Sequence, residues 1–152
     1  MNNFYTSMSA IEYSKQGKLD EWIHTFLCGE GNNISFSHGL KLENRYYIGP
    51  IKMPLDFFRR CCGPEENIKY HIDKIGFENR VDAIKIKLQS GWDMPPLIIN
   101  YADGRFELND GNHRYEALIR SGIKEYYVIV WITKQNDYQQ FVSNYSSYVD
   151  CS

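Results

Sequence analysis

The sequence lacks the features that would place the protein in a membrane, outside the cell or on nucleic acid. No apolar stretch among its 152 residues approaches the ~20 residues that a membrane span needs. The first residues do not show the charged-then-apolar order of a signal peptide. A net charge of −2 and a pI of about 6.1 provide no global basic field to hold nucleic acid. We therefore expect a cytoplasmic protein with neither a membrane nor a nucleic acid as its partner.

Metal-ligand spacings are missing as well. The chain has four cysteines and four histidines, but no C-x-x-C pair and no H-E-x-x-H segment. Cys61 and Cys62 are adjacent, while Cys28 and Cys151 lie far from them along the chain. In the cytoplasm we expect all four thiols to be reduced. The sequence therefore predicts neither a structural zinc site nor a disulfide framework.

What the chain does have is the composition of an ordinary globular protein. Hydrophobic residues make up 43% and charged residues 24% of it, which argues against disorder. Its length fits one domain, and a domain of ~150 residues buries enough surface to fold without a disulfide or a metal. No internal repeat or low-complexity tract is present. We expect a single domain over residues 1–152.

Amphipathic spacing predicts helices in three segments. Over residues 18–28, apolar side chains recur at i, i+3, i+4, i+7 and i+8, and Gly29 offers a left-handed stop. A second helix is expected over 78–90. A third is expected after residues 110–112 and ends at Gly122, with an apolar face formed by Tyr115, Leu118 and Ile119.

Runs of β-branched and aromatic residues predict four strands. Residues 45–53 fit a strand interrupted at Gly49-Pro50. Residues 97–100 and 105–108 fit the two strands of a hairpin, because a Gly-containing turn separates them. Residues 126–132 are almost continuously apolar, which is typical of a central strand buried on both faces.

The remaining segments carry weaker patterns. Residues 29–44 are rich in Gly, Asn and Ser and predict a long loop. Pro54 is expected to open a short helix. The tail from Thr133 is polar, with room for one more helix through Tyr138, Phe141 and Val142. Together the elements predict the α+β class, as a small mixed β-sheet flanked by helices.

The segment with the clearest chemical character is residues 110–114, which read DGNHR between a strand end and a helix start. Gly111 permits a tight or left-handed backbone. The first turn of the following helix presents unpaired N–H groups and a partial positive charge. His113 and Arg114 add side-chain donors, and an arginine can bind phosphate through two hydrogen bonds. The functional interpretation is a phosphate site on this turn.

The same residues also fit a purely structural role. Asp110 or Asn112 could cap the helix, while Arg114 forms an ion pair with Glu116 or Glu107. Turns with glycine, a polar residue and a basic residue are common where a strand passes into a helix. From the local pattern alone, both interpretations stay open.

A longer stretch around this turn resembles the ParB/sulfiredoxin superfamily. Between residues 91 and 131 the chain contains the segments PPLIIN, DGNHRYEAL and YYVIVW, in the order strand, hairpin, Gly-ended helix and strand. ParB-type domains carry Gly-Glu-Arg-Arg followed two residues later by Ala, where this chain reads GNHRYEA over 111–117. Sulfiredoxins carry Gly-Cys-His-Arg at this place, and the motif of free-serine kinases begins Asp-Gly-His.

The resemblance covers about residues 46–132 and implies a division of the chain. We expect a ParB/sulfiredoxin-like core over 45–132 and a C-terminal tail over 133–152. Residues 1–44 match nothing in the family, and we expect them to form an N-terminal helical extension.

The resemblance also implies a ligand. Members of the family bind a nucleotide, which is ATP, ADP or CTP in different branches, usually with Mg²⁺. Asp110 precedes the motif and could coordinate Mg²⁺ or orient a nucleophile, and Glu116 could support the metal or the arginine. We therefore predict Asp110 and Glu116 as catalytic residues and Asp110 as the metal ligand. The nucleotide phosphates are expected on Gly111, Asn112, His113 and Arg114.

These observations predict a nucleotide-binding domain that could hydrolyse nucleotide or transfer a phosphoryl group to a small-molecule acceptor. One alternative is a non-catalytic module whose nucleotide occupancy is read by a protein partner. A second alternative, a ParB-like nuclease or DNA-binding protein, is disfavoured by the acidic pI. Asn112 stands where sulfiredoxins place their Cys nucleophile, which excludes sulfinic-acid reduction. Only twenty residues follow Ile132, so we expect no helix-turn-helix domain.

Other residues carry weaker signals. Trp92, close to Pro95 and Pro96, fits either the core or the wall of a base pocket. Glu65 and Glu66 form a second pair of carboxylates. A triphosphate could also be reached by basic residues in the same region, although a solvated surface explains them as well: Arg59, Arg60 and Lys69.

Overall fold

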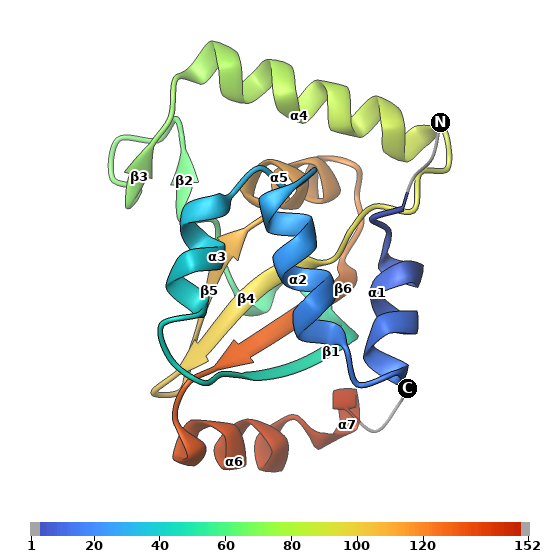
Figure 1. Cartoon of the computed structure of the whole chain (residues 1–152). Coiled ribbons are helices and arrows are strands. Elements are labelled where there is room, and N and C mark those ends of the chain that lie inside the picture. Colours follow the sequence, from blue (N-terminus) through green and yellow to red (C-terminus); the bar gives the residue numbers. More distant parts are fainter. Residues whose placement is uncertain (1–3, 150–152) are drawn as a thin grey trace.

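The computed structural model describes residues 4–149, and Figure 1 shows the arrangement of its helices and strands. The strands are β1 (Tyr46–Pro54), β2 (Cys62–Gly63), β3 (Tyr70–His71), β4 (Leu97–Ala102), β5 (Arg105–Asp110) and β6 (Glu125–Ile132). The helices are α1 (Ser7–Lys15), α2 (Leu19–Cys28), α3 (Ile34–Leu40), α4 (Lys74–Gln89), α5 (Asn112–Arg120), α6 (Gln135–Asn144) and α7 (Ser146–Val149), with a 3-10 turn at Leu55–Phe57. The expected α+β class, a mixed sheet flanked by helices, is confirmed.

The main sheet has the strand order β1-β6-β4-β5. β1 runs antiparallel to β6, β6 parallel to β4, and β4 antiparallel to β5. β6 therefore lies inside the sheet, as its apolar sequence predicted. β4 and β5 form the expected hairpin, whose turn places Asp103 and Gly104 at positive φ. Because β5 ends at Asp110, the hairpin delivers the chain directly to the start of α5.

Alternate side chains of β4 and β6 enter two different cores. Ile98 and Ile129 point to the face covered by α1, α2 and α3, which lies in front of the sheet in Figure 1. Leu97, Ile99 and Val130 point to the other face, where they pack with buried side chains of α4, α5 and α6. Both central strands are thus buried on two sides, which explains why their sequences are apolar without alternation.

The N-terminal helices form one of these two layers. The helix predicted over 18–28 is α2, and its Trp22, Ile23 and Leu27 are completely buried against the sheet. α1 packs beside α2, and its Ala10 is equally buried. The segment expected as an extension therefore covers a face of the sheet that would otherwise expose Ile98 and Ile129.

The long loop predicted over 29–44 is wrong in part, because residues 34–40 form α3. This helix has only seven residues, and its sequence, ISFSHGL, has a glycine and two serines. Isolated helices of this length are not stable, so packing rather than local propensity decides the outcome. Leu40 supplies that packing, since it is 2% exposed and joins the core beneath α2.

Two further boundaries differ from those predicted. α4 begins at Lys74 rather than at 78, because the Asp73 side chain accepts a hydrogen bond from the Gly76 N–H at 3.0 Å and caps the helix. β1 continues through Gly49-Pro50, where the pairing with β6 shifts in a bulge instead of breaking. Within residues 4–149, none of the helices combines the length and the apolarity that crossing a bilayer requires.

Two details of the predicted helix ends and faces are also corrected. Gly29 follows α2 at a φ of −113°, so it does not provide a left-handed stop. Ile119 was expected on the buried face of α5 but is 43% exposed, while Ala117 and Leu118 are completely buried. The predicted short helix after Pro54 is the 3-10 turn, and the predicted tail helix is α6.

Truncation of Trp22 tests whether the N-terminal layer belongs to the cooperative fold. Trp22→Ala is expected to lower the free energy of unfolding by about 3–5 kcal/mol, because it removes a completely buried ring that stacks on Phe26. Met8→Ala, at a residue 57% exposed on α1, should change it by less than about 0.5 kcal/mol. Urea titration followed by circular dichroism measures both. Equal, small effects would show that this layer unfolds independently of the sheet.

Candidate functional site

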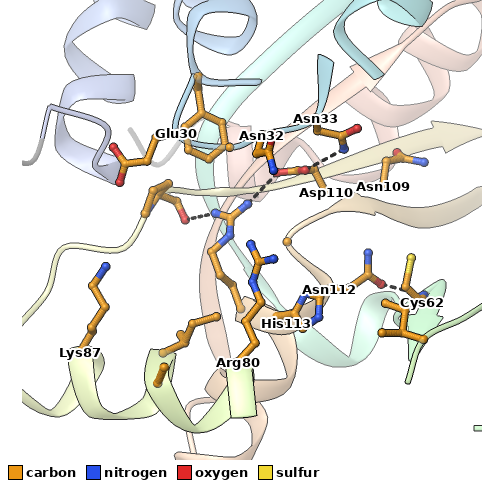
Figure 2. Close-up of a pocket in the computed structure, with 18 of the residues that line it drawn as sticks. Glu30, Asn32, Asn33, Cys62, Arg80, Lys87, Asn109, Asp110, Asn112 and His113 are labelled. Atoms are coloured by element: carbon orange, nitrogen blue, oxygen red, sulfur yellow. Dashed lines mark hydrogen bonds and ion pairs between the residues drawn. The ribbon is translucent and has the colours of Figure 1, made fainter. Parts of the chain in front are cut away.

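A pocket of about 460 Å³ opens where three parts of the chain meet (Figure 2). The first wall is the turn from β5 to α5, residues 109–114. The second is one face of α4, and the third is the turn that joins α2 to α3, residues 30–33. Phe26 and Trp92 add aromatic surface. A volume of this size suits a small organic ligand. All five residues predicted over 110–114 line this pocket, whereas Glu116 does not.

Gly111 gives the first wall its shape. It is the residue before α5, with a φ of 103°, in the left-handed region that other residues avoid. A Cβ there would lie 2.7 Å from the Leu97 Cδ2 atom and 2.9 Å from the Arg114 Nη2 atom, so only glycine fits. The first helical hydrogen bond runs from the Tyr115 N–H to the Gly111 oxygen, at 2.7 Å. The N–H groups of the three residues before Tyr115 therefore have no partner within the helix, which is the usual state of a helix N-terminus.

Arg114, predicted to bind phosphate, makes its contacts inside the protein. Its Nη2 atom lies 2.8 Å from Oδ2 of Asp110, and its Nη1 atom donates to the carbonyl oxygens of Pro95 and Pro96 at 2.8 and 2.9 Å. The Arg114 and Asp110 side chains are only 11% and 10% exposed. Burial lowers the pKa of Arg114, and the neighbouring Asp110 opposes this shift. The geometry corresponds to the structural interpretation of the motif, although the partner is Asp110 rather than either expected glutamate.

Asp110 is held from both sides. Its Oδ1 atom accepts a hydrogen bond from Nδ2 of Asn33 at 3.0 Å, and its Oδ2 atom is paired with Arg114. Within residues 4–149, no three His, Cys, Asp or Glu side chains are gathered as a metal would require. Both oxygens of Asp110 are engaged by protein donors, and the Mg²⁺ expected on this residue stays a prediction.

Asn112 anchors a neighbouring loop with its side chain. Its Oδ1 atom accepts hydrogen bonds from the N–H groups of Cys61 and Cys62, at 2.7 and 3.1 Å, and the residue is 7% exposed. The side chain predicted to bind a nucleotide is thus structural. What Asn112 offers the pocket is its backbone N–H, at the first position of α5.

His113 lies in the pocket wall as a neutral side chain. Its ring packs on Phe77, with ring centroids 5.0 Å apart. Burial and, after it, the positive charges of nearby arginines together lower the pKa of His113 to about 4: Arg80, Arg60 and Arg114. Near pH 7 the imidazole therefore carries no charge, and the turn around it has a positive potential.

Glu116, predicted to be catalytic, belongs to an ion-pair network outside the pocket. Its Oε1 atom lies 3.0 Å from Nε of Arg60, and its Oε2 atom lies 2.8 Å from Nε of Arg120. Arg60 also pairs with Glu65, and Arg120 with Glu78. The network ties α5 to α4 and to the segment before β2. Glu116 is thereby separated from Asp110, and the structure does not bring the two predicted catalytic carboxylates together in the pocket.

The weaker candidates around residue 65 also lie outside this pocket. Glu65 is engaged with Arg60, and Lys69 forms an exposed ion pair with Glu107 at 3.0 Å. Arg59 and Lys69 line a different hollow, which Cys61 also lines. These basic side chains therefore cannot serve the ligand that the turn at 110–114 would bind.

Sequence reasoning missed two basic residues of the second wall. Arg80 and Lys87 lie on the face of α4 that lines the pocket, and within residues 4–149 neither forms an ion pair with a carboxylate. The Lys87 Nζ atom lies 4.0 Å from the centroid of the Trp92 ring, which also lines the pocket. A signal was present, because Arg80, Ala83 and Lys87 have the i, i+3, i+7 spacing of one helix face.

No protein-family model matches the chain, and no curated protein matches it. Solved structures do, among them sulfiredoxin from Arabidopsis thaliana, with a TM-score of 0.40 and 20% identity over 64% of this chain and 97% of that one. A Pnob8-like ParB-N domain matches with a TM-score of 0.41 and 17% identity, over 66% of this chain and 34% of that one. C-terminally truncated ParB from Caulobacter crescentus, complexed with CTP-γ-S, matches with a TM-score of 0.36 and 14% identity, over 68% and 53%. These are the two kinds of protein that the sequence was said to resemble.

Removal of the Asp110 charge tests the buried pair. Asp110→Asn is expected to lower the free energy of unfolding by about 3–5 kcal/mol, because it leaves the buried Arg114 guanidinium without its counter-charge. The double variant Asp110→Asn, Arg114→Met removes both charges and should recover a large part of that loss. Urea unfolding of the three proteins measures the difference. An Asp110→Asn variant as stable as the wild type would contradict the pairing.

The low pKa of His113 predicts a dependence of stability on pH. Between pH 6.5 and 4 the unfolded chain protonates this histidine, whereas the folded protein resists protonation. Its contribution is therefore complete above pH 6.5 and is lost as the pH falls toward 4. After a discount for partial exposure to solvent we expect it to amount to ~1 kcal/mol.

Urea unfolding at pH 7 and pH 4.5 measures this contribution. The wild type should lose ~1 kcal/mol more between the two pH values than His113→Asn does. His71→Asn, at an exposed histidine outside the pocket, should behave like the wild type. Identical losses in all three proteins would show that His113 titrates normally.

Proposed function

We propose that the pocket binds a nucleotide through its phosphate groups. The observation that carries this proposal is the position of Arg80 and Lys87, which have no carboxylate partner within residues 4–149 and share the pocket with the N-terminus of α5. A helix N-terminus attracts anions through its unpaired N–H groups and its dipole. Guanidinium and ammonium groups add charge-assisted hydrogen bonds to phosphate oxygens. In this proposal Arg80 and Lys87 take the role that the sequence suggested for Arg114.

The electrostatics of the first wall support an anionic ligand. Burial is the main cause of the low pKa of His113, but the charges of nearby arginines, Arg80 first among them, lower this pKa as well, which is the effect of a positive potential at that point. The protein as a whole has a net charge of −2, so this potential is local to the pocket. A local field of this kind concentrates anions at one place on an otherwise acidic protein.

The aromatic surface of the pocket supports a nucleotide rather than free phosphate. Trp92 and Phe26 both line it, close to the cationic wall. Flat aromatic rings favour stacking with a base or other planar group. A cavity of about 460 Å³ also exceeds what a single phosphate ion would fill.

Binding without turnover is the form of this function that the side-chain contacts favour. Asp110 is paired with Arg114, and Glu116 is paired with Arg60 and Arg120. Both oxygens of each carboxylate are thus engaged by side chains of the protein, with Asn33 as the second partner of Asp110, which leaves neither carboxylate in position to orient a nucleophile. We therefore place the non-catalytic module, whose nucleotide occupancy a protein partner would read, ahead of hydrolysis or phosphoryl transfer to a small molecule.

Neutralising the α4 cations tests the proposal. Arg80→Gln and Lys87→Gln are each expected to weaken nucleotide binding about tenfold, because each removes one charge-assisted contact to phosphate. Isothermal titration calorimetry with ATP, ADP and CTP, with and without Mg²⁺, measures the affinities, and chromatography of the same samples detects any product.

Two matched variants serve as controls. Arg59→Gln and Lys74→Gln remove the same charges from exposed positions outside the pocket, so both should bind like the wild type. Absence of binding by the wild type, or equal losses in the control variants, would refute phosphate recognition by α4. Release of product by the wild type would move catalysis ahead of binding alone.

A further inference from the structure

We propose that the turn joining α2 to α3 binds the sugar hydroxyl groups of the nucleotide, with the Glu30 carboxylate as their acceptor. This inference rests on the proposed function and adds a ligand feature to it, the ribose. It also assigns a binding role to the N-terminal layer, in which sequence comparison found no counterpart in the family.

The charges of the pocket are sorted between its walls. The α4 wall carries Arg80 and Lys87, whereas the α2–α3 turn carries Glu30, Asn32 and Asn33. Asp110 is neutralised by Arg114, so Glu30 is the carboxylate of the pocket that has no ion-pair partner within residues 4–149. In Figure 2, Glu30 lies at the opposite end of the pocket from Asn112 and His113.

An unpaired carboxylate near a phosphate site constrains the ligand. It repels phosphate oxygens, so the part of the ligand beside Glu30 must be neutral and must carry hydrogen-bond donors. Hydroxyl groups of a sugar meet both conditions, and their bonds to a carboxylate are charge-assisted. The same pairing of an acidic side chain with ribose hydroxyls occurs in dinucleotide-binding folds of unrelated topology.

The backbone of the turn that carries Glu30 is held in place before a ligand arrives. Backbone hydrogen bonds tie the turn to the end of α2, from the N–H groups of residues 31, 32 and 33 to the oxygens of Phe26, Gly29 and Leu27, at 2.7, 3.0 and 2.7 Å. A Cβ on Gly31 would lie 2.8 Å from the Cε2 atom of Phe26, so the turn packs against this ring as only glycine can. A backbone that is already ordered loses little entropy on binding, which favours selectivity.

The sugar side and the phosphate side are joined by one hydrogen bond. Asn33 donates from Nδ2 to the Asp110 Oδ1 atom at 3.0 Å, which fixes the α2–α3 turn against the turn that begins α5. The span between Glu30 and the α5 N-terminus is therefore set by the fold. A ligand must place its hydroxyl groups and its phosphates at that one separation.

Deoxynucleotides provide the test. The wild type is expected to bind ATP and CTP at least about tenfold more tightly than their 2′-deoxy or 3′-deoxy analogues, whichever lacks the hydroxyl group that Glu30 binds. The analogue binds more weakly because it leaves the acceptor in the site without its hydrogen bond. In Glu30→Ala the affinities for the ribonucleotide and for its deoxy analogue should agree within about twofold, mainly because the variant binds the ribonucleotide more weakly. Glu12→Ala removes an exposed carboxylate from α1, outside the pocket, and should keep the wild-type ratio. Calorimetry in EDTA and in Mg²⁺ measures all of these affinities.

Each other outcome overturns a defined part of the account. If ribonucleotides and both deoxy forms bind the wild type equally, the ribose assignment fails while nucleotide binding stands. If Glu30→Ala weakens ribo- and deoxynucleotides alike, Glu30 does not contact a hydroxyl group. An effect of Glu30→Ala that appears only in Mg²⁺ would make this carboxylate a metal ligand instead. If no nucleotide binds the wild type, the proposed function and this inference fail together.

Discussion

The buried ion pair between Asp110 and Arg114 is the interaction on which the arrangement of the site depends. It joins the end of β5 to the first turn of α5, and Arg114 extends it to the carbonyl oxygens before β4. Asn33 extends it to the N-terminal layer. A buried pair of this kind adds little net stability compared with apolar side chains, but breaking it is costly. Its effect is therefore to fix three segments of the chain in one geometry.

The sequence was sufficient for elements whose character is local. The apolar run at 126–132, the stripe of α2 and the β4–β5 hairpin were all predicted, because periodicity and turn residues determine them. α3 was missed because packing stabilises it against a poor local sequence. In the site, the turn at 110–114 was predicted, but the pairing of Arg114 with Asp110 and with two carbonyl oxygens was not. This pairing depends on groups that only the folded chain brings together. The same is true of residues 30, 80 and 112, which meet in one pocket.

Basic residues of the same type have different roles because their partners differ. Arg60 and Arg120 are neutralised by Glu65, Glu116 and Glu78, and they tie helices together on the outside of the pocket. On α4, Arg80 and Lys87 form no ion pair with any carboxylate of residues 4–149. Charge that is balanced within the fold contributes to its geometry, and charge that is left unbalanced beside a cavity is available to a ligand. The distribution of glutamates therefore distinguishes the two groups, while a count of arginines and lysines does not.

The double burial of β4 and β6 leaves their alignment poorly specified by polarity. In a sheet with one solvent-exposed face, a shift of the strand register by one residue would move apolar side chains into water and would therefore be unfavourable. Here such a shift would only exchange apolar side chains between two apolar layers. The polar Asn100 side chain resolves this ambiguity, since its Nδ2 atom donates to the Trp131 carbonyl oxygen at 3.1 Å across the parallel pair. This hydrogen bond, together with the one from Nε1 of Trp131 to Oδ1 of Asn109 at 2.9 Å, therefore favours the observed register over alternatives that bury the same apolar surface.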